Sequence, residues 1–149
     1  IHVQFTNSRQ ISTLKENNIR VSIQPPFYNS DLSTARKLFE ESFLKKVGYQ
    51  YDKISSSGIS FSISTDSPIE SENPFSTLYY SEHFMSREDA FEAYSQKSAE
   101  HIFQENTLGK IDIGYFADFF TLNKDLFSIP RREILGTIPE QVFLGGKLL

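Results

Sequence analysis

One predicted β-strand occupies the segment Ile59-Ser60-Phe61-Ser62-Ile63-Ser64-Thr65-Asp66-Ser67-Pro68. Apolar side chains stand at every second position from 59 to 63, which is the period of a strand. Gly58 marks the start, and Pro68 ends the strand because proline cannot extend a ladder of backbone hydrogen bonds. The strand therefore brings Asp66 to its C-terminal end, where the carboxylate either carries chemistry or caps the following turn.

Upstream of this strand, the hydrophobic period switches between two and that of a helix. The predicted elements are a strand over 1–5, a helix over 7–17, a strand over 19–24, a helix over 30–46 and a short helix over 51–57. This order is typical of parallel βαβ units, whose strands all end at one edge of the sheet. We therefore expect His2, Gln24 and Asp66 at or near one edge, where α/β-barrel enzymes place catalytic groups.

The residues after Pro68 show a different order of predicted elements. A polar loop after Pro68 is predicted to lead into a short helix over 75–82, a longer helix from Ser86 to about 102, a strand over 116–122, a short helix over 130–135 and a hairpin over 141–149. The hairpin turns at Gly145-Gly146, a two-residue loop. Because the late strands lack the spacing of βα units, we expect them in a separate β layer.

Length and composition set limits on what the chain can be. Its 149 residues have room for one domain, but an eight-stranded barrel needs roughly 250 residues. The net charge of −4 makes nucleic acid an unexpected partner, and the absence of cysteine excludes thiolate metal sites and disulfides. No apolar run approaches the roughly 20 residues of a membrane span, and no signal peptide is visible. We expect a cytoplasmic protein whose chain begins, at Ile1, inside a longer sequence.

Other chemistry-bearing residues have simpler interpretations. His83 and His101 lie away from the predicted strand ends, so we expect both to be structural or solvated. Glu70 and Glu72 flank a serine in a polar loop, where solvated carboxylates are the better interpretation than an acid–base pair. His2 is open to two interpretations, a metal ligand or a hydrogen-bonded structural histidine. The sequence contains no phosphate-binding loop, no His-Glu-x-x-His motif and no Gly-x-Ser-x-Gly motif.

Five segments in this order resemble the C-terminal part of the amidohydrolase superfamily, and more narrowly the YtcJ-like metal-dependent hydrolases of amidohydrolase family 3. The matching segments are Ile1-His2-Val3-Gln4, Ser22-Ile23-Gln24-Pro25, Ser64-Thr65-Asp66-Ser67-Pro68-Ile69-Glu70 with Asn73-Pro74-Phe75, Gly109-Lys110-Ile111 with Gly114 and Ala117-Asp118-Phe119, and Val142 to Lys147. They resemble the ends of barrel strands six, seven and eight, the lead into the C-terminal β-sandwich, and its closing hairpin.

The resemblance implies a fold and roles for several residues. It implies an α/β chain: residues 1–108 as the last strands and helices of a (β/α)8 TIM-type barrel, and residues 109–149 as part of a small β-sandwich. It implies that His2 and Asp66 bind a divalent metal, usually zinc, and that Asp66 also moves the proton of a metal-activated water during hydrolysis of an amide-type C–N bond. Gln24 and Asn73 would contact the small-molecule substrate.

The resemblance is incomplete, because the family's remaining metal ligands would lie upstream of Ile1. We therefore expect this piece alone to be inactive, and to need the N-terminal part of the same protein or to self-associate as a homo-oligomer through open strand edges. The alternative is a non-catalytic, self-associating interaction module or a degenerate hydrolase remnant, in which His2 and Asp66 are idle. Bound metal distinguishes the two interpretations.

Overall fold

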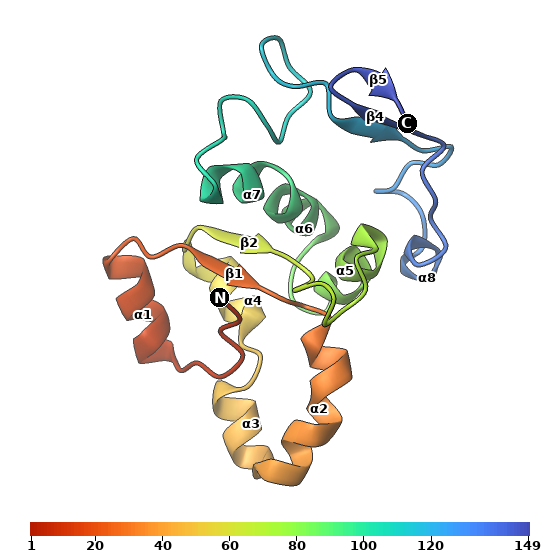
Figure 1. Ribbon diagram of the computed structural model, residues 1–149. Helices are drawn as coiled ribbons and strands as arrows, with labels where there is room; N and C mark the ends of the chain where they lie inside the picture. The colour runs from red at the N-terminus through yellow and green to blue at the C-terminus, as the bar shows by residue number, and fades with distance from the viewer.

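The computed structural model describes residues 1–149 as a mixed α/β chain of eight helices and five strands (Figure 1). The helices are α1 (Ser8–Glu16), α2 (Phe27–Leu38), α3 (Glu41–Val47), α4 (Tyr51–Ser57), α5 (Pro74–Ser81), α6 (Arg87–Tyr94), α7 (Gln96–His101) and α8 (Arg131–Ile134). The strands are β1 (Val21–Ile23), β2 (Phe61–Ile63), β3 (Phe119–Thr121), β4 (Gln141–Leu144) and β5 (Lys147–Leu148). They form two separate sheets, a parallel pair β1-β2 and an antiparallel sheet β3-β4-β5.

The parallel pairing of β1 with β2 confirms the βαβ order expected from the sequence. Val21 lies opposite Phe61 and Ile23 opposite Ile63, and all four side chains are buried in the hydrophobic core. Helices α6 and α7 contact β2, while α2 and α3 project from the sheet as a helical hairpin (Figure 1). Ser22 and Ser62 stand between these apolar residues and face the opposite way, because side chains alternate along a strand.

The first five residues do not form the strand that their alternating pattern predicts. They make only two isolated bridges, a parallel one from His2 to Ile23 and an antiparallel one from Phe5 to Gly48. The reason is local, since His2 and Val3 have positive φ angles of 73° and 52°, which an extended ladder does not accept. The segment still runs beside β1, because the His2 backbone N–H donates to the Ser22 carbonyl at 2.9 Å.

Two helices predicted as continuous are broken. Residues 30–46 contain most of α2 and most of α3, which are separated where Phe39 turns extended at φ −129° and ψ 147°. This break lets the Phe39 ring pack on Phe5 and Phe43, at 5.2 Å from each. The helix beginning at Ser86 is interrupted at Ser95, whose hydroxyl donates to the Phe91 carbonyl, a bond that bends helices. The predicted helices over 7–17 and 51–57 are confirmed as α1 and α4.

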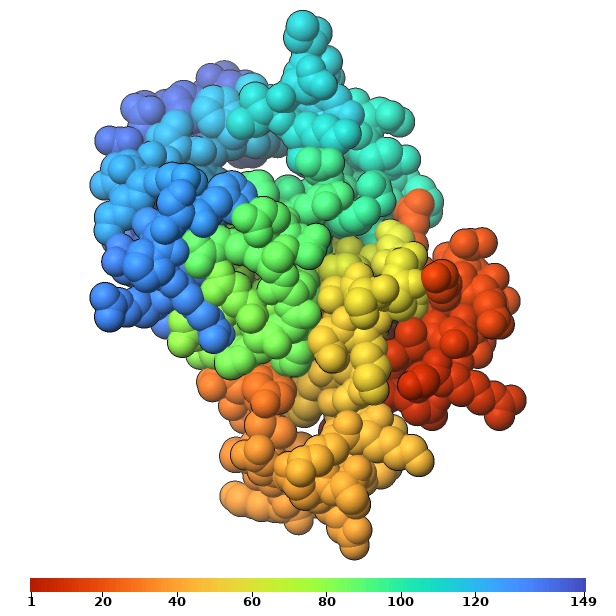
Figure 2. Space-filling view, turned by 180° about the vertical axis from the view of Figure 1, so that it is seen from behind, coloured from red at the N-terminus to blue at the C-terminus, as the bar shows by residue number.

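The C-terminal region carries the antiparallel sheet and contacts the rest of the molecule through α8. Seen from behind, these late residues abut the segment that contains α5 (Figure 2). The predicted hairpin is confirmed, with Gly145 and Gly146 both at positive φ, as its two-residue turn requires. Leu126 and Ile134 are buried in the same core cluster as β1 and β2. The predicted boundary at residue 108 thus separates two sheets but not two hydrophobic cores, and it stays a prediction.

Large apolar side chains remain on the surface in several places. Ile111, Ile113 and Leu149 expose 82%, 99% and 79% of their surface. These residues lie in or near the C-terminal sheet, where β3 and β5 are edge strands. Exposed apolar patches of this kind commonly mark contact surfaces between proteins. None of the helices combines the length and apolar character needed to cross a bilayer.

Candidate functional site

His2 is held by contacts to its backbone and to its ring. Its N–H donates to the Ser22 carbonyl, and its own carbonyl accepts from the Tyr51 hydroxyl at 3.3 Å. The imidazole stacks on the Phe27 ring at 5.8 Å between centroids. The ring nitrogen Nδ1 lies 2.9 Å from Gln24 Oε1, whereas Nε2 has no hydrogen-bond partner in the protein. The Nε2 lone pair is therefore available to a ligand-binding role when Nδ1 carries the proton.

Gln24 is fully buried directly after β1, and its amide joins the two strands. Its Nε2 donates to Ser64 Oγ at 2.6 Å and, more weakly, to Ser22 Oγ at 3.4 Å. The two serine hydroxyls lie 3.2 Å apart. Every polar atom of the Gln24 side chain thus has a protein partner, and none is left pointing to bulk solvent. This arrangement suits a structural link to His2, and the substrate contact expected of Gln24 stays a prediction.

Asp66 lies just beyond the C-terminal end of β2, as the sequence predicted. Its side chain is exposed and its backbone has a positive φ of 56°. The turn that follows is capped by another residue, because Thr65 Oγ1 accepts the Ser67 N–H at 3.1 Å. The Asp66 backbone carbonyl accepts from Ile69, but no group in the protein hydrogen-bonds the carboxylate. The turn-cap alternative for the Asp66 carboxylate is therefore wrong, and the carboxylate is free for another partner.

Asn73 has a local structural task. Its side-chain Oδ1 accepts the Phe75 N–H at 2.9 Å, and Pro74 occupies the first position of α5. This is the usual start of a helix, since the cap satisfies one N–H that has no partner within the helix. The sequence marks this start by the Asn-Pro pair, so the cap itself requires no ligand. A substrate contact from Asn73 stays a prediction.

His2 and Asp66 provide two candidate metal donors. One imidazole with a free Nε2 and one carboxylate without hydrogen bonds match the chemistry of zinc ligands. Nowhere in the chain do three or more His, Asp or Glu side chains converge in a way that could hold a metal ion. Catalytic zinc sites use three protein ligands and an open position. The two donors therefore fit part of such a site, and their chemistry agrees with the set expected from the sequence.

His101 and His83 do not join this group. His101 lies over the other end of β2, where Nδ1 is 2.9 Å from Ser62 Oγ and Nε2 is 3.4 Å from Ser60 Oγ. Burial lowers the pKa of His101 below its usual value, and the nearby Arg20 lowers it further. His83 is exposed and lies among aromatic rings, with its centroid 5.6 Å from that of Tyr28. Both histidines thus have structural surroundings, as expected.

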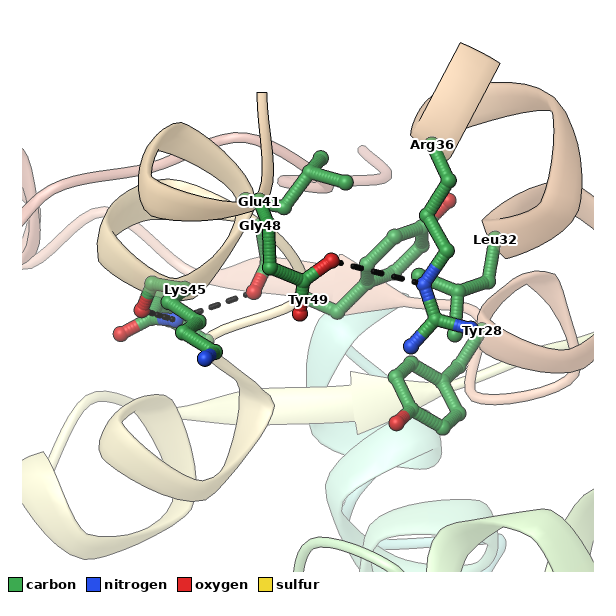
Figure 3. A pocket seen from close by; sticks show the side chains of 9 residues that line it. Tyr28, Leu32, Arg36, Glu41, Lys45, Gly48 and Tyr49 are labelled. Atoms are coloured by element: carbon green, nitrogen blue, oxygen red, sulfur yellow. Dashed lines mark hydrogen bonds and ion pairs between the residues drawn. The ribbon is translucent and has the colours of Figure 1, made fainter. Parts of the chain in front are cut away.

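A separate cavity of about 180 Å³ lies between α2 and α3 (Figure 3). Tyr28, Leu32 and Tyr49 form its apolar wall, and an ion pair of 3.6 Å joins Arg36 to Glu41. Burial and the nearby Asp31 carboxylate raise the pKa of Tyr49 to about 12, so its phenol stays neutral at physiological pH. None of the sequence-predicted site residues lines this cavity, so it is distinct from the site at the strand ends.

The sequence did not single out the residues that surround His2. Ser22 and Ser64 stand in the matching segments without an assigned role, yet they share the sheet face of Gln24 and hold its amide. Their even spacing along the strands was the available signal, because positions 22 and 24 must face the same way. Tyr51 and Phe27 come from α4 and α2, and only the folded chain brings them to His2.

Comparison with solved structures identifies similar folds. A metal-dependent hydrolase from Pyrococcus furiosus, described as uncharacterized, is 30% identical over 76% of this chain with a TM-score of 0.67. A second one, from Pyrococcus horikoshii OT3, is 23% identical over 88% of the chain with a TM-score of 0.77. An adenosine deaminase from Xanthomonas campestris with bound zinc is 14% identical over 99% of the chain with a TM-score of 0.71. No curated protein matches the chain.

The chain covers only 25%, 29% and 35% of these three structures, so it spans well under half of their length. The two less similar structures agree with this chain in fold alone. The sequence model of an amidohydrolase family, in contrast, matches residues 1–149, which is the whole chain. The chain therefore belongs to the amidohydrolase family.

Proposed function

We propose that this chain is the C-terminal part of a YtcJ-like, metal-dependent amidohydrolase that hydrolyses an amide-type C–N bond of a small molecule. Residues 1–108 would form the last strands and helices of a (β/α)8 barrel, and residues 109–149 part of a small β-sandwich. The remaining metal ligands would come from an N-terminal part of the same protein. We propose further that the protein is cytoplasmic and associates as a homo-oligomer through its exposed apolar surface.

The observation that carries the proposal is the match of the amidohydrolase family over the whole chain, together with the free Nε2 of His2 and the free carboxylate of Asp66. A divalent ion such as zinc lowers the pKa of a coordinated water from about 15.7 towards 7. His2 would hold the ion through Nε2. Asp66 would hold it as well, accept the proton of the attacking water, and deliver that proton to the leaving nitrogen. Gln24 and Asn73 are candidates for substrate contacts.

Zinc is the metal that we propose, for two reasons. Imidazole nitrogen and carboxylate oxygen are both common zinc ligands. The similar Xanthomonas campestris structure is a zinc-bound protein. The identity of the ion in this chain is open to direct measurement of metal content.

The second candidate is a non-catalytic module that self-associates, and the exposed Ile111, Ile113 and Leu149 favour it. Both candidates predict association of chains, so an oligomer does not separate them. Bound metal separates the two candidates, because the hydrolase should hold about one or two ions per chain, in line with one-metal and two-metal catalytic sites. A module in which His2 and Asp66 are idle should hold none.

The test uses protein from the complete reading frame, assayed for zinc by atomic emission and for release of amine from a panel of N-acyl amino acids. The variant is Asp66→Asn, which keeps the size of the side chain but removes its ability to accept a proton. Loss of a general acid–base group costs about 10²–10⁴ in rate, so we expect a fall in kcat of that order.

Asp52→Asn is the matched control, because Asp52 is an exposed carboxylate on α4 of the same part of the chain. Its activity should equal that of the unmodified protein. Protein without bound metal, or an Asp66→Asn variant as active as Asp52→Asn, would rule out the hydrolase proposal and favour the interaction module.

A further inference from the structure

We infer that Gln24 is a positioning residue, which fixes the ring orientation and the tautomer of His2 so that Nε2 is the atom presented to a metal. This role differs from the substrate contact suggested for Gln24 by the sequence, and the inference rests on the proposed function. Metal-binding histidines commonly donate their second ring N–H to an oxygen acceptor, which sets the tautomer and raises the basicity of the binding nitrogen. In this chain the buried amide oxygen of Gln24 can be that acceptor.

The geometry around Gln24 supports this role. Gln24 Oε1 lies 2.9 Å from His2 Nδ1, and the residue is fully buried, so water does not compete for the bond. On its other side, the Gln24 amide donates to Ser64 Oγ at 2.6 Å. Ser64 stands on the segment that leads from β2 to Asp66. The Gln24 side chain therefore links His2, which lies beside β1, to the segment after β2 that carries Asp66.

The His2 ring has little freedom to escape this arrangement. Phe27 stacks on one face of the ring, and Tyr51 and Ser22 hold the backbone from both sides. The positive φ of His2 is unfavourable for a residue other than glycine, and these contacts hold His2 in that conformation. The ring is thus presented to Gln24 in one orientation. What remains to be set is which of its two nitrogens carries the proton.

The direction of the Gln24 amide decides which nitrogen of His2 carries the proton. With Oε1 towards His2, Nδ1 carries the proton and Nε2 keeps its lone pair. With the amide reversed, the Gln24 NH₂ group would donate to Nδ1, and the proton would sit on Nε2, where it would block metal binding. Both serine hydroxyls can donate or accept, so the tautomer of His2 itself is the measurable distinction.

The experiment records long-range ¹H–¹⁵N correlation spectra of the metal-free protein labelled with ¹⁵N-histidine, at a pH where imidazole is neutral. Metal must be absent because a bound ion would impose the tautomer by itself. The protein comes from the complete reading frame, and the His2 signals are those lost in His2→Gln. We expect the pattern of a proton on Nδ1 for His2, and a proton on Nε2 would overturn the inference.

Variants then test whether Gln24 is the cause. Gln24→Leu should abolish the preference of His2 for a proton on Nδ1, and retention of that preference would overturn the inference. Ser62→Ala is the control, because Ser62 bonds His101 and should alter only the His101 signals. Should Gln24→Leu fail to fold, Gln24→Glu keeps an oxygen acceptor. It should keep the proton on Nδ1, and a shift of the proton to Nε2 would contradict the inference.

Zinc binding gives the second readout, by competition with a chelating dye on protein from the complete reading frame. Loss of such a supporting residue weakens metal binding about 10–100-fold, which we expect for Gln24→Leu. A protein that binds zinc and hydrolyses amides, but has its His2 proton on Nε2 when metal-free, would overturn this inference and leave the proposed function intact. A proton on Nδ1 in a protein without zinc or activity would support the orientation and overturn the function.

Discussion

Replacing Arg87 with methionine should destabilise the fold strongly, because this arginine ties the start of α6 to the segment before α8. Its guanidinium donates to the Glu82 carboxylate and to the Leu126 carbonyl, and a further bond of 2.8 Å reaches the Ile129 carbonyl. The side chains of Arg87 and Glu82 expose only 12% and 15% of their surface. Methionine keeps most of the apolar stem but removes every donor.

The expected loss of stability follows from the buried Glu82 charge that loses a partner. Removing one partner of a buried charge pair costs about 3–5 kcal/mol, since the other charge stays buried without full compensation. Arg131 lies 3.5 Å from the same Glu82 carboxylate and will compensate in part, which places the expectation near the lower value. With a denaturant dependence of about 2 kcal/mol/M, a loss of 3 kcal/mol lowers the urea midpoint by about 1.5 M.

The assay is urea unfolding followed by far-UV circular dichroism, and Lys124→Met is the matched control. Lys124 pairs with Glu133 at 3.1 Å, but the two side chains expose 59% and 38% of their surface. Exposed pairs contribute about 0–1 kcal/mol, so the control should shift the midpoint by no more than about 0.5 M. Equal midpoints for the two variants would refute the argument that burial makes the Arg87 pair important.

Two further predictions concern the core and the pH dependence. Ile134→Ala should lower the free energy of unfolding by about 2–5 kcal/mol, because Ile134 is fully buried. Ile138→Ala is the control at a 78% exposed position and should change it by less than about 0.5 kcal/mol. Thermal unfolding measures both variants, and equal losses would contradict the packing argument. His101 has a folded-state pKa below its ordinary 6.5, mainly through burial, so the unfolded chain takes up the proton first and stability falls as pH drops below about 6.5. His101→Asn should therefore lose less stability between pH 7.5 and 5.5 than the unmodified protein, and an equal loss in urea unfolding would show that His101 does not contribute.

Local sequence signals predicted several elements well. The alternation around Ile63 predicted β2 and placed Asp66 at its end, a short helix was predicted over 75–82 where α5 lies, and Gly145-Gly146 marked a hairpin turn. These features depend on neighbouring residues along the chain, so their physical cause is present in the sequence. The same local rules failed at His2 and Val3, whose alternating pattern predicted a strand that positive φ angles prevent.

The breaks in the two long predicted helices have different origins. Helical spacing runs through Phe39, but the backbone turns extended there and the Phe39 ring packs on Phe5, which is far away in sequence. At Ser95 the cause is local, because its hydroxyl donates to the Phe91 carbonyl one turn earlier, and α7 then leads to His101 beside β2. The Phe39 contact depends on a residue that only the fold brings near, and periodicity along one segment does not contain it.

The amino-acid sequence by itself determined the βαβ order, the carboxylate at the end of β2, the β hairpin and the family to which the chain belongs, because each of these rests on residue type and spacing. Only the tertiary structure decided that Gln24 bonds His2, that Thr65 rather than the Asp66 side chain caps the turn, and that Arg87 joins two distant segments. The Gln24 and Arg87 bonds join residues far apart in the sequence, so packing in three dimensions sets their partners, and the Thr65 cap depends on the backbone conformation of the folded turn. Periodicity does not encode these bonds, because a hydrogen bond requires both a short distance and good alignment of donor and acceptor.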